Sequence, residues 1–529
     1  GGFAMRHHVP LLALSLAAAA RAAALPPVAK IHVCGRWFCD PLGRVRIFHG
    51  FNDVGEAKQS GAFDGFNYLP KLMREPALVS QLHEWGFNVM RLPMMWAALQ
   101  PSDGALSTAY LAAMRNITQE LAAHGLFSFL DMHQDVLSSK LGSYDGAPQW
   151  VVNRTTPRHA YPWPLTLPLK QWGLGYLAEA TGQSFQEIYH NTHGGRDAWA
   201  AAWRGVAAHF RGDAAILGYE LINEPFAGDI YADPTLLLPG VAGRKNLMPA
   251  YDAVAAAIRA VDDATIVLFE PVTWGMILPT AAGALPKLGG SGFDRPPGGR
   301  AYANRSAFAF HYYCWFATGI SEQKPSSAAY PPLEKAECDR VFGPLVFDAV
   351  DATVEYIGGA SIMTEFGAMV PNASSPSSLG TLEMEWVLNE ADRRFQSWTY
   401  WDIGALFSAA PSGAHAPRME ALLPFIRPFA RAIAGTPVGT SFDYRSARFT
   451  LAFRVAADLL APTEIFLPSL RYPRGYSVTV APASSLQCGA CPNETGASPK
   501  LAHDLLCCLA SPGFVGVANV TVVPRPTHT

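Results

Sequence analysis

Residues 216–225 read ILGYELINEP, and residues 361–367 read SIMTEFG. Each stretch begins as a continuous apolar run, which is typical of a strand covered on both faces, and each carries a carboxylate near its end, Glu224 or Glu365. Two carboxylates on separate strands come together only if the ends of those strands meet. Whether they meet depends on how the other strands of the chain are arranged.

Six further runs resemble these two. They are VRIFHGFN (45–52), FNVMRLP (87–93), LFSFLDMH (126–133), TIVLFEP (265–271), FAFHYY (308–313) and WTYWD (398–402). Amphipathic segments between the runs predict helices at 107–124, 196–211, 246–260, 345–357 and 379–394. Eight alternations over about 400 residues predict an α/β fold, the (β/α)8 TIM barrel. A doubly wound open sheet is the alternative, but it usually carries a Gly-rich nucleotide loop, and no GxGxxG or Walker sequence follows any of the runs.

The pattern changes at about residue 436. FDYRSARFTLAFRV, TEIFLPSL and YSVTVAP alternate apolar and polar residues, and only 499–509 has a helical period. This pattern predicts a small β-sandwich. We therefore expect a catalytic barrel at 30–435 and a C-terminal β-sandwich at 436–529.

The composition excludes some classes of function. Half of the 529 residues are hydrophobic, which is enough for a large core and excludes disorder as the main state. The net charge is −3, so no basic excess is present to bind a phosphate backbone, and nucleic acid is not an expected partner.

The N-terminal residues have the pattern of a secretory signal peptide. A short basic start after Met5 precedes an apolar run at 9–20, and the small residues Ala22 and Ala24 follow. We expect a signal peptide within 1–25, with residues 1–4 as a remnant before the initiator. The alternative is an uncleaved anchor, for which the run is short. A secreted protein, or one of a lysosome-like compartment, is expected.

Sequons and cysteines agree with this expectation. Sequons begin at Asn116, Asn153, Asn304, Asn372, Asn493 and Asn519. Eight cysteines suggest disulfides, and they occur as Cys34 with Cys39, Cys314 with Cys338, and a group of Cys488, Cys491, Cys507 and Cys508. A zinc site is the alternative for the last group, but a second CxxC is missing.

Polar residues gather where the predicted barrel would have its active site, at the C-terminal ends of the strands. They are Arg91, His133, Asn223, Glu224, His311, Tyr313, Glu365 and Trp401. Paired carboxylates suit the hydrolysis of glycosides, since one donates a proton while the other attacks the anomeric carbon. The sequence has no HExxH and its histidines stand singly, so neither a metal nor another cofactor is expected.

The motifs resemble a known family. N-E-P at 223–225 and E-F-G at 365–367, within an eight-strand pattern, resemble glycoside hydrolase family 5. MHQD at 132–135, DGAPQW at 145–150 and GFN at 50–52 resemble its endoglycoceramidase branch, over roughly 45–430. The resemblance implies a retaining enzyme that cleaves the β-glycosidic bond between an oligosaccharide and ceramide. It also implies a β-domain after the barrel.

The resemblance also implies roles for individual residues. Glu224 would be the acid/base and Glu365 the nucleophile, with the two carboxyl groups about 5 Å apart. Arg91 would keep Glu365 ionised and Tyr313 would hydrogen-bond it. We expect a raised pKa for Glu224 because the nearby Glu365 opposes its ionisation.

The remaining residues would bind the sugar. Asn223 would bond the 2-hydroxyl, Trp401 would form the floor under the cleaved sugar, and the other expected contacts are Lys58, His133, Asp135 and His311. Either Trp163 or Trp172, or both, would stack on sugar.

The lipid would bind elsewhere. The segments 161–177, 231–243 and 275–290 carry few charges and are expected on the catalytic face, where they would form an apolar rim for acyl chains. The alternative is a lid that buries these residues on the barrel. The expected partner is a glycolipid at a membrane or micelle surface, and no obligate protein partner is inferred.

Two other functions remain open. One is a β-glucosidase of simpler glycolipids or steryl glucosides, or a β-glucanase. The other is a catalytically silent protein that binds glycan or lipid, which the presence of both carboxylates disfavours.

Overall fold

The structure, a computed structural model, describes residues 30–54, 69–70, 72–143, 145–272, 290–314, 326–409, 415–491 and 499–526. The expected signal peptide at 1–25 lies outside these residues. Among the helices that are described, none combines the length and the apolar character that a membrane span requires.

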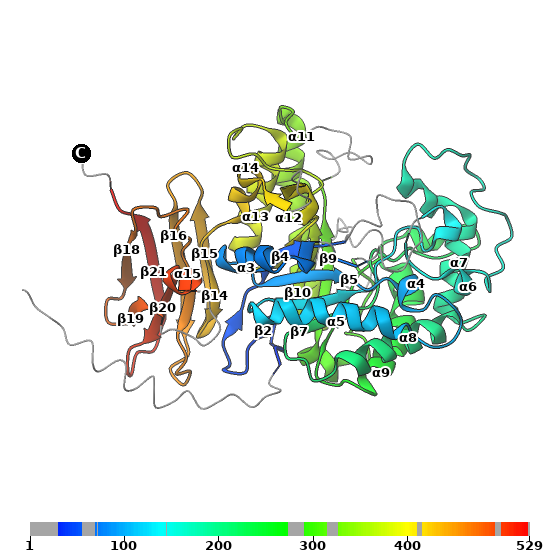
Figure 1. Cartoon of the computed structure of the whole chain (residues 1–529), viewed down its shortest axis with the longest axis horizontal. Coiled ribbons are helices and arrows are strands. Elements are labelled where there is room, and N and C mark those ends of the chain that lie inside the picture. Colours follow the sequence, from blue (N-terminus) through cyan, green and yellow to red (C-terminus); the bar gives the residue numbers. More distant parts are fainter. Residues whose placement is uncertain are drawn as a thin grey trace, which may run out of the picture.

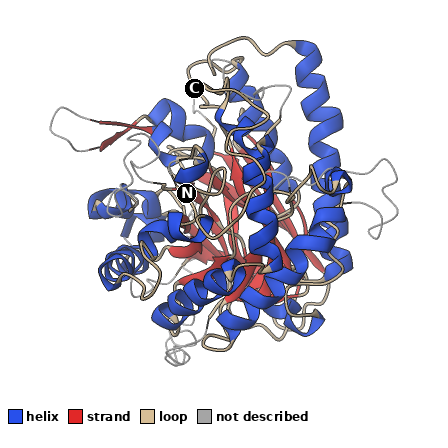
Figure 2. Cartoon of the chain, turned by 90° about the vertical axis from the view of Figure 1, so that its right-hand side faces the viewer, coloured by secondary structure: helices blue, strands red, loops and turns tan. Residues whose placement is uncertain are grey.

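Eight parallel strands close into a barrel, as the sequence predicted (Figures 1 and 2). The order around the barrel is β10-β11-β4-β5-β6-β7-β8-β9. The strands are β4 (His49–Asn52), β5 (Val89–Pro93), β6 (Phe127–Asp131), β7 (Ile216–Glu220), β8 (Ile266–Phe269), β9 (Ser306–Tyr312), β10 (Ala360–Phe366) and β11 (Ser397–Tyr400). Each of the eight apolar runs supplies one barrel strand.

Helices surround the strands (Figure 2). They are α3 (Pro76–Glu84), α4 (Trp96–Leu99), α5 (Thr108–Ala123), α6 (Gln149–Val152), α7 (Glu179–His190), α8 (Gly195–Phe210), α9 (Met248–Arg259), α11 (Pro332–Glu337), α12 (Gly343–Ile357), α13 (Leu379–Arg393) and α14 (Met419–Leu422). Helix α5 shows how the sequence sets such a helix. Its first turn is capped by the Ser107 hydroxyl, which accepts a hydrogen bond from the Tyr110 N–H, and Leu111, Met114 and Leu121 bury one stripe.

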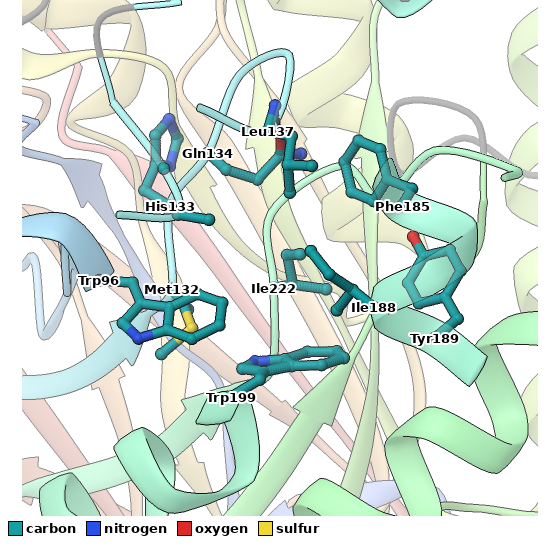
Figure 3. A pocket seen from close by; sticks show the side chains of 12 residues that line it. Trp96, Met132, His133, Gln134, Leu137, Phe185, Ile188, Tyr189, Trp199 and Ile222 are labelled. Carbon is teal, nitrogen blue, oxygen red and sulfur yellow. Dashed lines mark hydrogen bonds between the residues drawn. The ribbon is translucent and has the colours of Figure 1, made fainter. Parts of the chain in front are cut away.

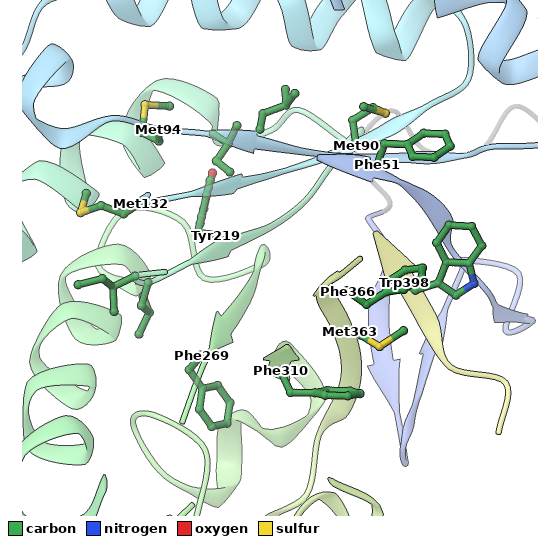
Figure 4. Packing of buried hydrophobic residues seen from close by; sticks show 14 of the residues in the cluster. Phe51, Met90, Met94, Met132, Tyr219, Phe269, Phe310, Met363, Phe366 and Trp398 are labelled. Atoms are coloured by element: carbon green, nitrogen blue, oxygen red, sulfur yellow. The ribbon is translucent and has the colours of Figure 1, made fainter. Parts of the chain in front are cut away.

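Alternation along the strands sorts residues between the barrel interior and the helix layer. On β8, Ile266 and Leu268 belong to the cluster inside the barrel, whereas Val267 and Phe269 pack outward against helices. Figure 4 shows this outer layer, including Phe269 and Phe310. Inward positions are therefore apolar at the start of a strand and, as described below, polar at its end.

An N-terminal hairpin closes the barrel at the end where the strands begin. The hairpin consists of β1 (His32–Cys34) and β2 (Trp37–Cys39). Ile31, Val33 and Phe38 join the cluster inside the barrel, and the Phe38 ring lies edge-on to Phe48 at 5.6 Å. This packing leaves the opposite end for a functional site.

The C-terminal region is a sandwich of two sheets, which confirms the predicted fold class. A seven-stranded sheet has the order β1-β2-β3-β14-β17-β20-β19, and a four-stranded sheet has the order β15-β16-β21-β18. The added strands are β3 (Val45–Arg46), β14 (Phe429–Ile433), β15 (Gly435–Asp443), β16 (Arg448–Val455), β17 (Thr463–Phe466), β18 (Tyr476–Ala481), β19 (Leu486–Ala490), β20 (Leu505–Ala510) and β21 (Val517–Pro524). A separate hairpin, β12 (Phe407–Ala409) and β13 (His415–Pro417), follows the barrel. The N-terminal strands β1 to β3 thus share a sheet with strands from beyond residue 428.

Two local predictions differ from the structure. The run 45–52 is not one strand, because Val45–Arg46 pairs within the seven-stranded sheet and the barrel strand starts at His49. The segment 499–509 is helical only over α15 (Pro499–His503), after which β20 pairs with β17 and β19. In both places pairing with distant strands decides the backbone conformation. The boundary at 435/436 stays a prediction.

All eight cysteines form disulfides. The pairs are Cys34–Cys39, Cys314–Cys338, Cys488–Cys508 and Cys491–Cys507. The last two bonds join β20 to β19 and the residue that follows it, so the thiolates that a zinc site would need are not available.

We predict that Phe38→Ala lowers the free energy of unfolding by about 3 kcal/mol, because it removes a buried ring from the closed end of the barrel. Phe38 is 3% exposed. Leu42→Ala, at a position 42% exposed in the same segment, is the control and should cost less than about 0.5 kcal/mol. Denaturant unfolding measures both. Equal losses of unfolding free energy in the two variants would contradict the conclusion that the hairpin closes the barrel.

Candidate active site

The strand ends bring the predicted polar residues to one end of the barrel. Arg91 lies on β5, His311 on β9 and Glu365 on β10, while the others lie one to four residues after the ends of their strands. Most of these side chains are buried, and Tyr313 and Trp401 are partly exposed. Such a set of polar groups at the mouth of an otherwise apolar barrel has the form of an active site.

The two carboxylates lie close together. An oxygen of Glu224 and an oxygen of Glu365 are within 4.8 Å of each other, and His311 Nδ1 lies 2.8 Å from the first residue and 3.5 Å from the second. Carboxyl groups about 5 Å apart are typical of retaining glycosidases, whereas inverting enzymes separate them by about 6.5–9.5 Å. The separation therefore suits direct attack by one carboxylate on the anomeric carbon.

A β-bulge directs Glu365 into the site. The pairing of β10 with β9 shifts between Met363 and Glu365. Ile362 faces the barrel interior and Met363 the helix layer, so strict alternation would turn Glu365 outward. The extra residue in the bulge reverses this, which is a common use of bulges beside active sites.

Glu365 is held by two donors. Arg91 Nη1 lies 2.5 Å from Oε1, and the Tyr313 hydroxyl donates to Oε2 at 2.8 Å. Burial opposes the charge of Arg91, but the carboxylates of Asp131, Glu220 and Glu365 outweigh it and raise the pKa of Arg91 well above its usual range. A permanent cation thus favours the ionised form that a nucleophile requires.

Glu224 has the environment of a proton donor. Burial raises the pKa of Glu224 to about 7, although a hydrogen bond from His311 Nδ1 at 2.8 Å opposes the rise. The sequence predicted this direction but attributed it to Glu365, whose charge is a smaller cause than burial. Withdrawal of the carboxyl group from water is the largest cause of this raised pKa.

Asn223 and Gln134 fix the chain around Glu224. Asn223 Oδ1 accepts from Arg91 Nη2 at 2.8 Å, and its amide donates to the Gln134 carbonyl at 3.1 Å. The Gln134 side chain donates back to the carbonyls of Asn223 and Glu224 at 2.6 and 2.9 Å. The Asn223 amide has a second hydrogen, which suits its predicted bond to a sugar hydroxyl.

His133, Asp135 and Trp401 form a second group. The His133 ring stacks on Trp401 with centroids 5.2 Å apart, and its Nδ1 lies 2.7 Å from Asp131. His133 Nε2 lies 4.0 Å from an Asp135 carboxylate oxygen. Figure 3 shows that His133 and Gln134 lie above an apolar layer that includes Met132, Ile222 and Trp199. This layer lines a small apolar pocket behind the site.

Five buried residues of the site were not singled out from the sequence. They are Asn52, Asp131, Gln134, Glu220 and Glu270. Asn52 and Glu270 are the last polar residues of predicted runs, and Gln134 lies within the quoted MHQD, so a signal was available for these three. Asp131 and Glu220 are the last residues of the observed strands β6 and β7. Asn52 and Glu220 bind Arg91 directly, at 3.0 and 2.6 Å.

Some residues of the predicted apolar rim are exposed and others are buried. The ring centroids of Trp163 and Tyr231 lie 5.6 Å apart, and the Tyr231 hydroxyl donates to the Leu177 carbonyl at 2.7 Å, so the loops after β6 and β7 lie side by side. Leu237 and Leu238 are 59% and 58% exposed, whereas Leu236 packs into a small core and is 4% exposed.

The structure does not place every predicted residue. Lys58 lies outside the described residues, as does the segment 275–289 of the second loop. The structure brings the other predicted site residues together at the barrel mouth, and their roles in binding and catalysis stay predictions.

Comparisons with known proteins agree with this geometry. Residues 53–406 match the family described as cellulase (glycosyl hydrolase family 5), and residues 427–495 match the glycoside hydrolase family 5 C-terminal domain.

An endoglycoceramidase of Cyanea nozakii is 32% identical over 84% of this chain and 86% of its own length. One of Hydra vulgaris is 29% identical over 84% of this chain and 81% of its own. The solved structure of endo-glycoceramidase II from Rhodococcus sp. has a TM-score of 0.68 at 24% identity, and the match covers 93% of this chain and all of that one. With its barrel, its carboxylate pair and its C-terminal domain, this chain belongs to glycosyl hydrolase family 5, in the endoglycoceramidase branch.

Proposed function

We propose that the protein is a secreted endoglycoceramidase, which hydrolyses the β-glycosidic bond between the glycan and the ceramide of glycosphingolipids with retention of configuration. The observation that carries this proposal is the pair of Glu224 and Glu365, whose nearest oxygens are within 4.8 Å. The endoglycoceramidases of Cyanea nozakii and Hydra vulgaris, similar over most of the chain, support the substrate class.

The first step forms a glycosyl-enzyme. A Glu365 oxygen bonds to the anomeric carbon, the bond from that carbon to the ceramide oxygen breaks, and Glu224 gives its proton to the ceramide oxygen. Ceramide leaves as an intact alcohol. The pKa of Glu224, about 7, keeps the proton available at neutral pH and below.

The second step releases the glycan. Glu224, now a carboxylate, removes a proton from water, whose oxygen bonds to the anomeric carbon as the bond to Glu365 breaks. Two inversions give net retention. Arg91 and Tyr313 stabilise the returning Glu365 carboxylate through the hydrogen bonds described above.

The lipid side of the site would favour ceramide over a second sugar. A glucan leaving group needs hydroxyl partners and aromatic platforms, whereas the loop after β7 presents Leu237 and Leu238. Burial of apolar surface contributes about 25 cal/mol per Å², so alkyl chains gain from such a rim and sugars do not.

Secretion rests on sequence features. Residues 1–25 have the pattern of a signal peptide, and the sequons are numerous. The sequon asparagines Asn116, Asn153, Asn304 and Asn519 are exposed, Asn372 is half-buried, and Asn493 lies outside the described residues. Exposed side chains are what glycosylation requires, and this supports a glycoprotein of the secretory pathway.

We predict that kcat/KM of the wild-type enzyme falls as pH rises above about 7, because Glu224 loses the proton that it must donate. Glu224→Gln should lose about 10²–10⁴-fold in activity on a glycolipid, together with this alkaline limb. A dinitrophenyl glycoside, whose leaving group needs no proton, should react with Glu365 normally, and azide should restore turnover.

The control for this variant is Glu383→Gln, since Glu383 is a buried carboxyl on α13 with a pKa that burial also raises to about 7. It should keep the wild-type pH profile. A Glu224→Gln enzyme with the full wild-type profile would show that another group is the acid.

We predict that a 2-deoxy-2-fluoroglycosyl fluoride labels wild-type protein on the peptide that contains Glu365, and that Glu365→Gln abolishes labelling. The fluorine slows release more than attack, so the covalent intermediate accumulates. Mass spectrometry of the digest gives the position. A label on any other residue would move the nucleophile there.

We predict that Leu237→Ser combined with Leu238→Ser raises KM for a micellar glycosphingolipid about tenfold and leaves turnover of an aryl β-glycoside unchanged. The loss of about 60 Å² of lipid contact corresponds to this factor. Leu236 is left intact because it is buried.

The matched control is Leu460→Ser with Leu470→Ser, at positions 67% and 46% exposed in the C-terminal region. This control should change neither KM for the glycosphingolipid nor turnover of the aryl β-glycoside. If the aryl substrate responds as strongly as the glycolipid, or if cello-oligosaccharides or steryl glucosides are cleaved faster than any glycosphingolipid, the ceramide assignment is wrong.

A further inference from the structure

Glu270 follows β8 and is fully buried beside both the acid/base and His311. Its Oε2 accepts a hydrogen bond from the Glu224 N–H at 3.1 Å, and its Oε1 lies 3.4 Å from His311 Nε2. The Tyr251 hydroxyl donates to its carbonyl at 3.0 Å and so fixes its backbone. The side chain therefore joins two elements of the site without facing the substrate itself.

We propose that Glu270 is a positioning residue for catalysis, which holds the backbone of Glu224 and keeps His311 as a doubly protonated donor to the Glu224 carboxyl group. This inference rests on the proposed role of Glu224 as the acid/base. It assigns to Glu270 no contact with the reacting atoms.

The backbone of Glu224 needs such support. Its φ is +41°, in the left-handed region that residues other than glycine seldom occupy, and such a conformation costs about 1–3 kcal/mol. Gln134 fixes the Glu224 carbonyl, and Glu270 fixes the N–H on the other side of the residue. Loss of the acceptor would leave a buried N–H without a partner and would free the strained residue to rotate.

His311 has a carboxyl group on each side of its ring. Its Nδ1 is hydrogen-bonded to a Glu224 oxygen at 2.8 Å, and its Nε2 lies 3.4 Å from Glu270 Oε1, an ion-pair distance without a hydrogen bond. The negative charge of Glu270 beside Nε2 favours the second proton of the imidazolium. Burial lowers the pKa of His311, but the charges of Glu270 and Glu365 and the hydrogen bond to Glu224 outweigh it and leave the pKa well above its ordinary value.

Charged groups from several strands act on His311. They are Glu224 after β7 and Glu365 on β10, both in contact, Asp131 on β6, Glu220 on β7, and Arg91 on β5, which lies 3.5 Å from Glu270 Oε1. Glu224 and Glu365 lie beside Nδ1, whereas Glu270 lies beside Nε2. Its removal should leave Nδ1 as the donor to Glu224 on a neutral ring.

The charge of His311 determines the direction in which the pKa of Glu224 changes. The imidazolium favours the ionised form of Glu224 and thereby holds the pKa of that acid below the value that burial alone would give. If His311 becomes neutral, the pKa of Glu224 rises. The alkaline limb of activity then moves to higher pH, which a purely structural loss would not produce.

The test compares Glu270→Gln with wild type on an aryl β-glycoside. We expect kcat to fall about tenfold with little change in KM, and the alkaline limb of kcat/KM to rise by about one pH unit. Glu383→Gln, which removes a buried carboxyl outside the site, is the control and should leave the limb in place. A Glu270→Gln profile that superimposes on the wild-type profile would overturn the proposal.

A second variant separates the effect of the Glu270 charge from the effect of its hydrogen bond with the Glu224 N–H. Glu270→Asp keeps the carboxylate but withdraws it by one methylene from the Glu224 N–H. It should lower kcat while the alkaline limb stays at the wild-type pH, and this comparison also serves if Glu270→Gln does not fold. Wild-type kcat in Glu270→Asp would contradict the backbone role.

A readout without turnover makes the test independent of the proposed function. In protein labelled with ¹⁵N-histidine, the His311 imidazolium signal, assigned with His311→Gln, should disappear at lower pH in Glu270→Gln than in wild type. An unchanged His311 titration would refute the link between Glu270 and His311. If wild type hydrolyses no β-glycoside at all, the proposed function is wrong. The titration still shows whether Glu270 affects the protonation of His311.

Discussion

The Arg91 guanidinium is buried at the mouth of the barrel, and the strands around it are arranged to satisfy its charge. It binds Glu220 at 2.6 Å, Glu365 at 2.5 Å and Asp131 at 3.1 Å, and it also donates to the amide oxygens of Asn52 and Asn223. Removal of one partner from a buried ion pair typically costs about 3–5 kcal/mol. Since these partners come from β4, β6, β7 and β10 and the residues after them, a shift in register of one strand would leave a charge unpaired. The same cation thus fixes the barrel mouth and favours the ionised form of Glu365.

Buried acids outnumber buried cations at this end of the barrel, and the excess explains where protons reside. Burial is the first cause that raises the pKa of Asp131 to about 8 and that of Glu270 and Glu224 to about 7. Arg91 and His311 cannot neutralise every carboxylate, so the acids share protons as a coupled set. Glu224 is therefore one member of a group whose neighbours affect its titration, and a substitution at one carboxyl changes the pKa of the others.

Much of the fold and part of the site could be predicted from the sequence, for a physical reason. Strands covered on both faces must be continuously apolar, so the eight runs mark the eight barrel strands, and polar residues at their ends are conspicuous. Pairing between distant segments was not predictable. Nothing in residues 32–39 shows that they plug the barrel, and strict alternation would have turned Glu365 away from the site, because the bulge on β10 has no local sequence signal. Three consecutive leucines are equivalent in sequence, yet the short helix at Pro234–Leu237 buries Leu236 and leaves Leu237 and Leu238 exposed.

The seven-stranded sheet has a consequence for synthesis of the chain. Its strands β1 to β3 leave the ribosome before any barrel strand, but β3 pairs with β14, and the sheet continues through β17 and β20 up to residue 510. The sheet that contains β1 to β3 is therefore complete only after β14, β17 and β20 have been synthesised. A nascent barrel lacks this support until translation is nearly finished, so premature termination after residue 428 would release a protein with all eight barrel strands and an unpaired edge at β3. Quality control that recognises such an edge would distinguish truncated from complete chains even though Glu224 and Glu365 are present in both.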